Sequence, residues 1–266
     1  AGAKTFSIAS AGCSLRCLFC QNWQISQVSP EETRNINLLP EDVVKLAKEK
    51  NCPVIAYTYS EPINFYEYML DTAKIARAAG IKNIMHTAGY INQEPLETLL
   101  PYIDAANVDL KGFSPEYYKN VCGANLNDVL QTLKTMKKYK IWIEITTLIV
   151  PGYNDSPDEI KKLCTWIKTN LGPDTPVHFS RFYPVYKLAH LTATPYKTLE
   201  DAVNIARSVG LKHVYIGNVY DNPYENTVCS NCGKIVIKRK GFEVLENHIR
   251  KGKCEYCGTK IPGVWQ

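Results

Sequence analysis

The amino-acid sequence predicts an α/β protein built on parallel strands, with a small metal-binding module near its C-terminus. Two observations indicate this fold class. Over most of the chain, short strand-like runs alternate with longer segments whose apolar residues recur at helical spacing. After residue 220 this alternation stops, and two C-x2-C pairs follow. Repeated strand–helix units imply parallel strands with right-handed crossovers, so we expect a full or partial β/α barrel. A doubly wound open sheet is the alternative.

Seven segments have the length and composition of strands. The first of them alternates polar with apolar residues, as a half-buried strand does. In β/α barrels the functional residues lie at the C-terminal ends of the strands, so the residues that follow each run are candidate site residues. The expected strands are Thr5–Ala9, Val54–Tyr57, Lys82–His86, Ala106–Leu110, Ile141–Val150, Val177–Phe182 and His213–Ile216.

Six segments are expected to form helices. Apolar residues recur at helical spacing in Pro40–Lys50, and they share one face in Pro62–Ala79, which Gly80 ends as a C-cap residue would. Ser156 has the position of an N-cap for Pro157–Asn170. The other expected helices are Glu94–Tyr102, Leu126–Lys138 and Leu199–Val209.

Length and charge predict one large domain and a smaller one. A chain of 266 residues with 45% hydrophobic residues can bury a large core. A turn-rich break at residues 221–223 predicts a core domain over 1–222 and a zinc-ribbon or rubredoxin-like module over 223–266. The net charge of +5 falls entirely within Cys229–Gln266, which holds eight basic and three acidic residues. We interpret this as a solvated basic face; an acidic partner is the alternative, and we do not expect nucleic acid.

The compartment is expected to be the reducing cytoplasm. No apolar run approaches the roughly 20 residues that cross a bilayer, and no secretory signal is visible. The chain begins without Met and almost directly with a strand, so we expect a further N-terminal segment. Ten cysteines are present, and seven lie in two tight clusters, which indicates metal ligands. Cys52, Cys122 and Cys164 are isolated and are expected to be buried small side chains.

The first cysteine cluster has the spacing C-x3-C-x2-C and follows the first expected strand. Its members are Cys13, Cys17 and Cys20. Three thiolates from one loop can bind three corners of a cubane iron–sulfur cluster, which leaves the fourth iron open to a small molecule. Structural zinc takes four closed ligands, so three adjacent cysteines argue against zinc here.

With Phe19 before its last cysteine, this motif resembles the signature of the radical S-adenosylmethionine (radical SAM) family. The resemblance implies a 4Fe–4S cluster whose open iron chelates S-adenosylmethionine. It also implies an enzyme that, with one electron from an external reductant, cleaves this cofactor to a 5′-deoxyadenosyl radical, which abstracts hydrogen from a substrate. Phe19 is then expected near the adenine. The protein supplies binding and shielding, and the sequence assigns no acid or base.

The segment Tyr-Ser-Glu-Pro at residues 59–62 follows the second expected strand. The family carries Gly-Gly-Glu-Pro there, so the resemblance implies that Ser60 and Glu61 receive the methionine ammonium. A helix cap is the alternative, because a Ser-Glu-Pro start suits one. Residues 86–89 resemble an Asp-Thr-Asn-Gly stretch of the enzymes that activate pyruvate formate-lyase, which places Thr87 at the cofactor. His86 replaces an Asp that helps bind a monovalent cation in those enzymes, so we do not extend that cation site to this chain.

Asp109 and Lys111 end the fourth expected strand and match an Asp-Leu-Lys motif of the same activating enzymes. Strand alternation puts both side chains on one face. The resemblance implies contacts with the ribose and carboxylate of the cofactor, and a mutual salt bridge is the alternative.

Several motifs together, among them Cys-Gln-Asn-Trp, Tyr-Thr-Tyr-Ser-Glu-Pro and Asn-Val-Asp-Leu-Lys-Gly, resemble the radical SAM enzyme of the AmmeMemoRadiSam system. This resemblance implies Memo-like and AMMECR1-like partner proteins. A glycyl-radical enzyme activase is one alternative. A zinc-ribbon module that binds nucleic acid or protein is an alternative of another class, and it leaves the first cysteine cluster unexplained.

The second cysteine cluster consists of two C-x2-C pairs, each followed by glycine. Its members are Cys229, Cys232, Cys254 and Cys257. Four thiolates in this arrangement suit tetrahedral zinc, and a single iron is the alternative. So small a module is expected to need a metal in order to fold.

Overall fold

The computed structural model describes residues 2–265, and its main feature is a parallel sheet of seven strands in chain order. This order lacks the reversal of a doubly wound sheet, so it favours the barrel-type alternative, and β1 and β7 end it, as in a partial barrel. The strands are β1 (Thr5–Ile8), β2 (Val54–Tyr57), β3 (Lys82–Thr87), β4 (Ala105–Asp109), β5 (Trp142–Ile149), β6 (Val177–Arg181) and β7 (Val214–Gly217).

Helices follow most strands, as the sequence predicted. Two differ in their starts by more than one residue. The helix expected from Pro62 begins with a 3-10 turn, because the Glu61 side chain caps the Ile63 amide. The last helix begins three residues before Leu199, in a first turn whose polar residues carry no periodic signal. The helices are α1 (Trp23–Ser26), α2 (Pro40–Glu49), α3 (Tyr66–Ala78), α4 (Gln93–Leu99), α5 (Pro115–Tyr117), α6 (Leu126–Lys138), α7 (Pro157–Asn170) and α8 (Tyr196–Ser208).

Short turns complete the helical elements. The 3-10 turns are η1 (Pro30–Glu32), η2 (Pro62–Phe65), η3 (Leu100–Tyr102), η5 (Tyr186–Leu188) and η6 (Pro223–Glu225), and η4 (Tyr118–Cys122) is a π-helical turn. The sequence predicted neither η4 nor the short helices α1 and α5, because segments of three to five residues carry too little periodicity.

The described chain divides into two compact units. The first unit comprises residues 3–143 and 183–192, and the second comprises residue 2, residues 144–182 and residues 193–265. The first unit holds β1 to β4 and the first cysteine cluster, and the second holds β6, β7 and the second cluster. The domain boundary expected after residue 222 lies inside the second unit and stays a prediction.

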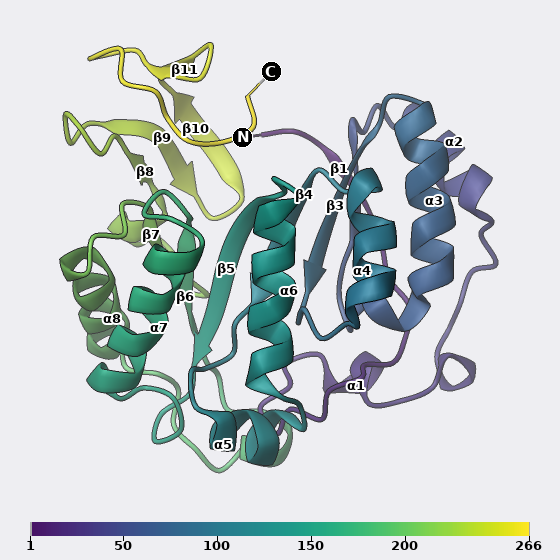
Figure 1. Cartoon of the computed structure of the whole chain (residues 1–266), viewed down its shortest axis with the longest axis horizontal. Coiled ribbons are helices and arrows are strands. Elements are labelled where there is room, and N and C mark those ends of the chain that lie inside the picture. The colour runs from purple at the N-terminus through teal and green to yellow at the C-terminus, as the bar shows by residue number, and fades with distance from the viewer. Residues whose placement is uncertain (1, 266) are drawn as a thin grey trace. The chain divides into compact units, whose positions relative to one another are not determined.

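In the first unit, parallel pairing aligns the C-terminal ends of β1 to β4. Ile8 pairs with Tyr57, and Thr87 pairs with Val108. Helix α2 packs on α3, and α4 packs on α6 (Figure 1). Residues of β3 and β4 alternate between a buried face and a more open one. The loops after these strands therefore start at one edge of the sheet, where the candidate site lies.

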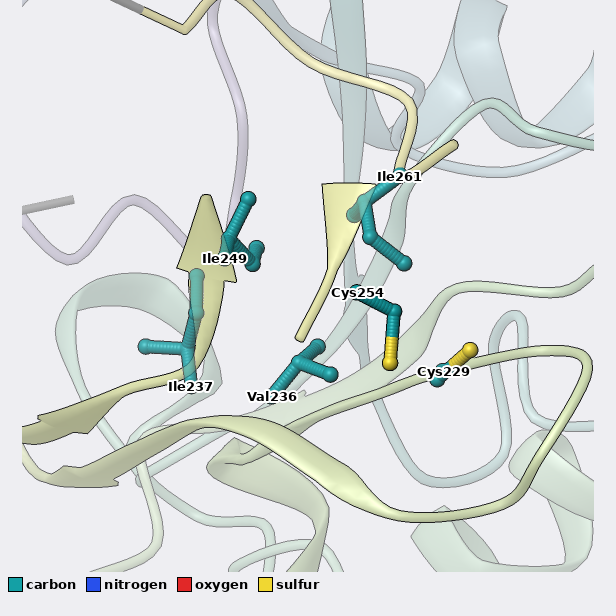
Figure 2. Packing of buried hydrophobic residues seen from close by; sticks show 6 residues of the cluster. All are labelled: Cys229, Val236, Ile237, Ile249, Cys254 and Ile261. Carbon is teal, nitrogen blue, oxygen red and sulfur yellow. The ribbon is translucent and has the colours of Figure 1, made fainter. Parts of the chain in front are cut away.

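In the second unit, α7 packs on α8, and α8 covers β6 and β7 (Figure 1). The cysteine-rich segment forms an antiparallel sheet and a small hairpin around a core of Cys229, Val236, Ile237, Ile249, Cys254 and Ile261 (Figure 2). Its strands are β8 (Thr227–Val228), β9 (Ile235–Lys240), β10 (Glu243–Asn247), β11 (Ile249–Arg250) and β12 (Lys253–Cys254). Within residues 2–265, the helices are too short or too polar to cross a membrane.

Candidate functional site

The first three cysteines lie on one loop that follows β1. Cys17 is buried, and Cys13 and Cys20 are partly buried. The amide of Leu15 donates to Cys13 Sγ at 3.4 Å, and Cys20 Sγ lies 3.0 Å from Ser26 Oγ. Burial raises the pKa of the Cys13 thiol to about 12. Sulfur atoms that lie within hydrogen-bond distance of backbone and hydroxyl groups on a buried loop suit an iron–sulfur cluster better than free thiols.

The cysteine loop is fastened to the π-helical turn η4. The amide of Arg16 donates to the Cys122 carbonyl at 2.8 Å, and the amide of Leu18 donates to the Val121 carbonyl at 2.9 Å. Gly123, which ends the turn with φ +68°, is so close that a Cβ would lie 3.2 Å from Arg16 Cβ. These contacts hold the cysteine loop in one conformation on both sides of Cys17.

Phe19 is buried between two side chains that come after β4. Its ring lies parallel to that of Tyr117, with centroids 6.1 Å apart, and Lys111 Nζ lies 5.9 Å from the Phe19 ring centroid. The aromatic residue of the motif therefore joins the cysteine loop to the end of β4. Its expected contact with adenine stays a prediction.

Glu61 is buried, with 1% of its surface exposed, and it ties the end of β2 to the end of β3. Its carboxylate accepts hydrogen bonds from Thr87 Oγ1 at 2.6 Å, from the Ala88 amide at 2.7 Å and from the Ile63 amide at 3.2 Å. Burial raises the pKa of Glu61 in spite of these three bonds. A carboxylate offers about four acceptor positions, so one is left for a further donor.

The alternative role of Glu61 as a helix cap is confirmed, since its side chain caps η2. The two residues before it, Tyr59 and Ser60, have φ values of +50° and +32°. This left-handed backbone favours glycine, and it costs other residues roughly 1–2 kcal/mol each. Ser60 Oγ donates to the Ser10 carbonyl, which joins the strained turn to the cysteine loop's first residues. Strain of this kind is concentrated at functional sites.

Asp109 stands between two cationic side chains at the end of β4. Its Oδ2 lies 3.0 Å from Lys111 Nζ, and its Oδ1 lies 3.0 Å from Nε2 of the half-exposed His86. Burial opposes the charged form of all three groups, and the ion pairs outweigh it. They lower the pKa of Asp109 and raise the pKa values of His86 and Lys111. The salt bridge expected as the alternative is therefore present, and it leaves cationic groups at the edge of the sheet.

A cavity of about 640 Å³ opens beside the cysteine loop at the starts of α3, α4 and α6. Sequence reasoning did not single it out, because its walls come from four separate segments of the chain. Two carboxylates, Glu67 and Asp128, belong to it, and the lining residues include no Lys, Arg or His. This lining favours neutral or cationic ligands.

Sequence reasoning also missed the surroundings of Cys122. The structure confirms that Cys122 and Cys164 are buried, whereas Cys52 is only partly buried. Cys122 does not lie alone, because the Cys17 thiol lies 4.0 Å from the Cys122 carbonyl oxygen and can donate a hydrogen bond to it. The spacing of 105 residues between the two cysteines offers no signal for this contact.

The second cysteine cluster has the geometry of a mononuclear metal centre. The four Sγ atoms lie within 4.8 Å of one another, with Cys229 and Cys257 separated by 3.7 Å and Cys232 and Cys254 by 3.8 Å. A tetrahedron with metal–sulfur bonds of about 2.3 Å has sulfur–sulfur edges of about 3.8 Å. The glycines after each pair have left-handed backbones in open space. The group therefore fits one zinc or iron ion.

The chain has relatives among known protein sequences. An uncharacterized protein of Methanocaldococcus jannaschii is 48% identical over 97% of this chain and 77% of its own length. The pyruvate formate-lyase 1-activating enzyme of Escherichia coli K12 is 27% identical over 57% of this chain, and the match covers 63% of that enzyme.

Solved structures share the fold. Streptococcus suis SuiB bound to S-adenosylmethionine has a TM-score of 0.65 at 13% identity, over 86% of this chain and 54% of SuiB. A domain of a pyruvate-formate lyase-activating enzyme from Bacteroides vulgatus has a TM-score of 0.54 at 15% identity, over 61% of this chain and 98% of that domain.

The family model that matches this chain is that of the radical SAM superfamily, over residues 7–167. This region contains the three cysteines of the first cluster, Glu61 and the ion pairs of β4. Enzymes of this family use a 4Fe–4S cluster, S-adenosylmethionine and an external electron donor. The matched region, which spans more than half of the chain, shows that the chain belongs to the radical SAM superfamily.

Proposed function

We propose that Cys13, Cys17 and Cys20 hold the 4Fe–4S cluster and that the chain directs radical chemistry at a substrate from the edge of β1 to β4. The observation that carries the proposal is the convergence at this edge of a three-thiol loop and a buried, hydrogen-bonded carboxylate, Glu61. When bound, the cluster supplies the electron that cleaves S-adenosylmethionine. The chain's own residues bind the cofactor and keep water away from it.

Glu61 is suited to receive the methionine ammonium. One acceptor position of its carboxylate is left after three hydrogen bonds, and a cationic amine would offset the cost of a buried charge. Thr87 uses its hydroxyl to donate to Glu61 and to accept from the Gly89 amide, so it orients the carboxylate. Ser60 holds the strained turn before Glu61.

Lys111 and His86 are suited to contact the carboxylate and the ribose of the cofactor. Asp109 holds these two side chains. The carboxylate of Asp109 holds the two side chains in place and favours their charged forms, since it raises both pKa values. A carboxylate placed near them would gain two charge-assisted hydrogen bonds. The Phe19 ring lies 5.9 Å from Lys111 Nζ, and Phe19 stays our proposal for adenine contact.

For the tail module, residues 223–265, we propose a structural zinc ion. Four thiolates with sulfur separations near 3.8 Å fit a closed tetrahedral site, and zinc is the usual ion in structural sites of this kind. A single iron has nearly the same geometry and is distinguished by its visible absorption.

We further propose membership of an AmmeMemoRadiSam-type system, with Memo-like and AMMECR1-like partners. The motif resemblance supports this. The match to the archaeal relative, 48% identity over 97% of the chain, extends much further than the 27% over 57% found for the E. coli activating enzyme. A glycyl-radical enzyme activase is therefore not the function we favour.

The test is anaerobic cleavage of S-adenosylmethionine. The chain is reconstituted with iron and sulfide, reduced with dithionite and analysed for 5′-deoxyadenosine. The wild-type protein and a Cys164→Ala control should form it, and Cys17→Ala should not. A fully loaded wild-type cluster that never cleaves the cofactor, even with Memo-like and AMMECR1-like proteins added, would overturn the proposal.

A further inference from the structure

The cavity beside the cysteine loop is separate from the residues proposed to bind the cluster and S-adenosylmethionine, because none of those residues lines it. Its volume of about 640 Å³ lies within the range of roughly 300–1,000 Å³ that is typical of small-molecule sites. Ser14, which stands between the first two cysteines, forms part of its wall. A molecule in this cavity would therefore be held next to the loop proposed to carry the cluster.

Hydrogen bonds between its three helices fix the wall of the cavity. Tyr66 Oη donates to the Pro95 carbonyl at 2.9 Å, which joins the start of α3 to α4. Thr135 Oγ1 donates to the side-chain oxygen of Gln93 at 2.6 Å, which joins α6 to the start of α4. The wall is thus largely pre-formed, as it is in most small-molecule sites.

The cavity carries two carboxylates that the described chain does not neutralise. Glu67 and Asp128 belong to the first turns of α3 and α6, and among residues 2–265 neither forms an ion pair. Four positions after Glu67 comes Asp71, and Lys74 pairs with Asp71 instead. Four positions after Asp128 comes Thr132, so neither helix provides the usual i,i+4 cation.

The helix starts do not cancel this negative charge. A helix N-terminus carries about half a positive elementary charge, so three of them supply about +1.5 against two full negative charges. The described residues that line the cavity include no Lys, Arg or His. The charge of the cavity therefore favours a cationic ligand.

The other lining residues distinguish between kinds of cation. Besides the two carboxylates, they bring four further hydrogen-bond acceptors, which are the hydroxyls of Ser14 and Tyr90 and the amide oxygens of Asn92 and Gln131. Two aromatic residues, Tyr66 and Tyr90, also belong to the wall. A guanidinium group has five N–H donors in one plane and stacks on aromatic rings, whereas an ammonium group has three donors. The number of acceptors and the two rings therefore favour guanidinium.

We propose that this cavity binds a guanidinium group and thereby holds a substrate that carries one beside the cysteine loop. The guanidinium belongs either to an arginine side chain of a protein or to a free guanidino compound. The inference rests on the proposed function, because it names the substrate class of that site. Binding to the cavity needs no reduction of the cluster and no cleavage of S-adenosylmethionine, so the two proposals can fail separately.

The experiment is isothermal titration calorimetry of the reconstituted full-length chain at low ionic strength. The probes are N-acetylarginine amide, its neutral near-isostere N-acetylcitrulline amide, and agmatine, which has the guanidinium without a peptide backbone. The arginine probe is expected to bind about tenfold more tightly than the citrulline probe, and Glu67→Gln and Asp128→Asn are each expected to weaken its binding about five- to tenfold. Both carboxylates are exposed, so these near-isosteric substitutions are expected to leave the fold intact. Glu41→Gln, which removes a first-turn carboxylate of α2 outside the cavity, is the matched control and is expected to bind like the wild type.

Equal affinities for the arginine and citrulline probes, or wild-type affinity in both Glu67→Gln and Asp128→Asn, would overturn the inference. An equal loss of affinity in Glu41→Gln would also overturn it, because net charge rather than the cavity would then explain binding. Binding of agmatine but not of N-acetylarginine amide would identify a free guanidino compound as the ligand, and binding of both would extend the site to arginine side chains. A chain that binds the arginine probe but never cleaves S-adenosylmethionine would refute the proposed function and leave the guanidinium site standing.

Discussion

Loss of one thiol from the tail module should unfold that module and leave the parallel sheet intact. Cys254 is 2% exposed and lies at the centre of the small core, so Cys254→Ser removes a metal ligand without adding bulk. The apolar side chains fully buried beside the cysteines are Val236, Ile237, Ile249 and Ile261 (Figure 2). Burial of each of these four side chains stabilises the module by about 1.5–3 kcal/mol, which makes roughly 6–12 kcal/mol in total. Structural zinc gives isolated zinc modules roughly 10–16 kcal/mol, so the metal is the larger contribution or an equal one.

The assay combines metal analysis with hydrogen exchange followed by mass spectrometry. Cys254→Ser should lose the tail metal and the protection of amides in β9 and β10, while amides of β2 to β4 keep theirs. Cys52→Ser, which changes a partly buried cysteine outside both clusters, serves as the control. A Cys254→Ser protein that keeps one equivalent of tail metal and full protection in β9 would refute the reasoning.

Three further predictions concern the site's supports. Thr87→Val removes a hydroxyl that donates to a buried carboxylate and should lower the free energy of unfolding by about 1.5–3 kcal/mol. The control Thr132→Val removes a buried hydroxyl without a partner among the described residues and should leave the free energy of unfolding unchanged. Equal losses for the two variants in urea titrations would contradict this. The folded state raises the pKa of His86 above 6.5, so the ion pair with Asp109 stabilises the fold fully below pH 6.5, and this stabilisation is lost as the pH rises through the raised value. Urea titrations across this pH range should therefore show a smaller fall in the free energy of unfolding for His86→Asn than for the wild type. The same dependence on pH in both proteins would contradict this. Gly123→Ala should lower the melting temperature more than Gly152→Ala. Both glycines have left-handed backbones, but only a Cβ at position 123 would press against Arg16 of the cysteine loop. Equal melting temperatures of the two variants would contradict the close contact between η4 and this loop.

Much of the fold was predictable because each helix and strand carries its own periodic signal. Helices such as α6 and α7 were predicted with the residues at both ends, since their polar and apolar residues alternate strongly and their caps are typical. Ser156 accepts a hydrogen bond from the Glu159 amide, as an N-cap does. The division of the chain into two compact units was not predictable, because it depends on contacts between distant residues rather than on local pattern.

The candidate site was predictable where residues follow strands directly. The face shared by Asp109 and Lys111 follows from strand alternation, and the structure joins their side chains. The same reasoning did not foresee that His86 completes this group, nor that Thr87 contacts Glu61 across two strands, since pairing register is a property of the folded sheet.

The support given by η4 was not predictable from the sequence. The carbonyl of Cys122 comes near the Cys17 sulfur through a rare backbone turn, and Cys122 belongs to no spaced motif. A cysteine that falls outside such a motif is most often an inert side chain, so only the folded structure distinguishes Cys122 from Cys164.

The most direct test of the account is the metal content of two reconstituted proteins. One is the wild-type chain, and the other carries Cys13→Ala, Cys17→Ala and Cys20→Ala together. The account predicts four irons and one tail metal in the wild type, with the iron signal of the reduced cluster altered by S-adenosylmethionine, and only the tail metal in the variant. A variant that keeps the four irons, or a wild-type cluster whose spectrum ignores the cofactor, would contradict the claim that these three cysteines hold a radical SAM cluster.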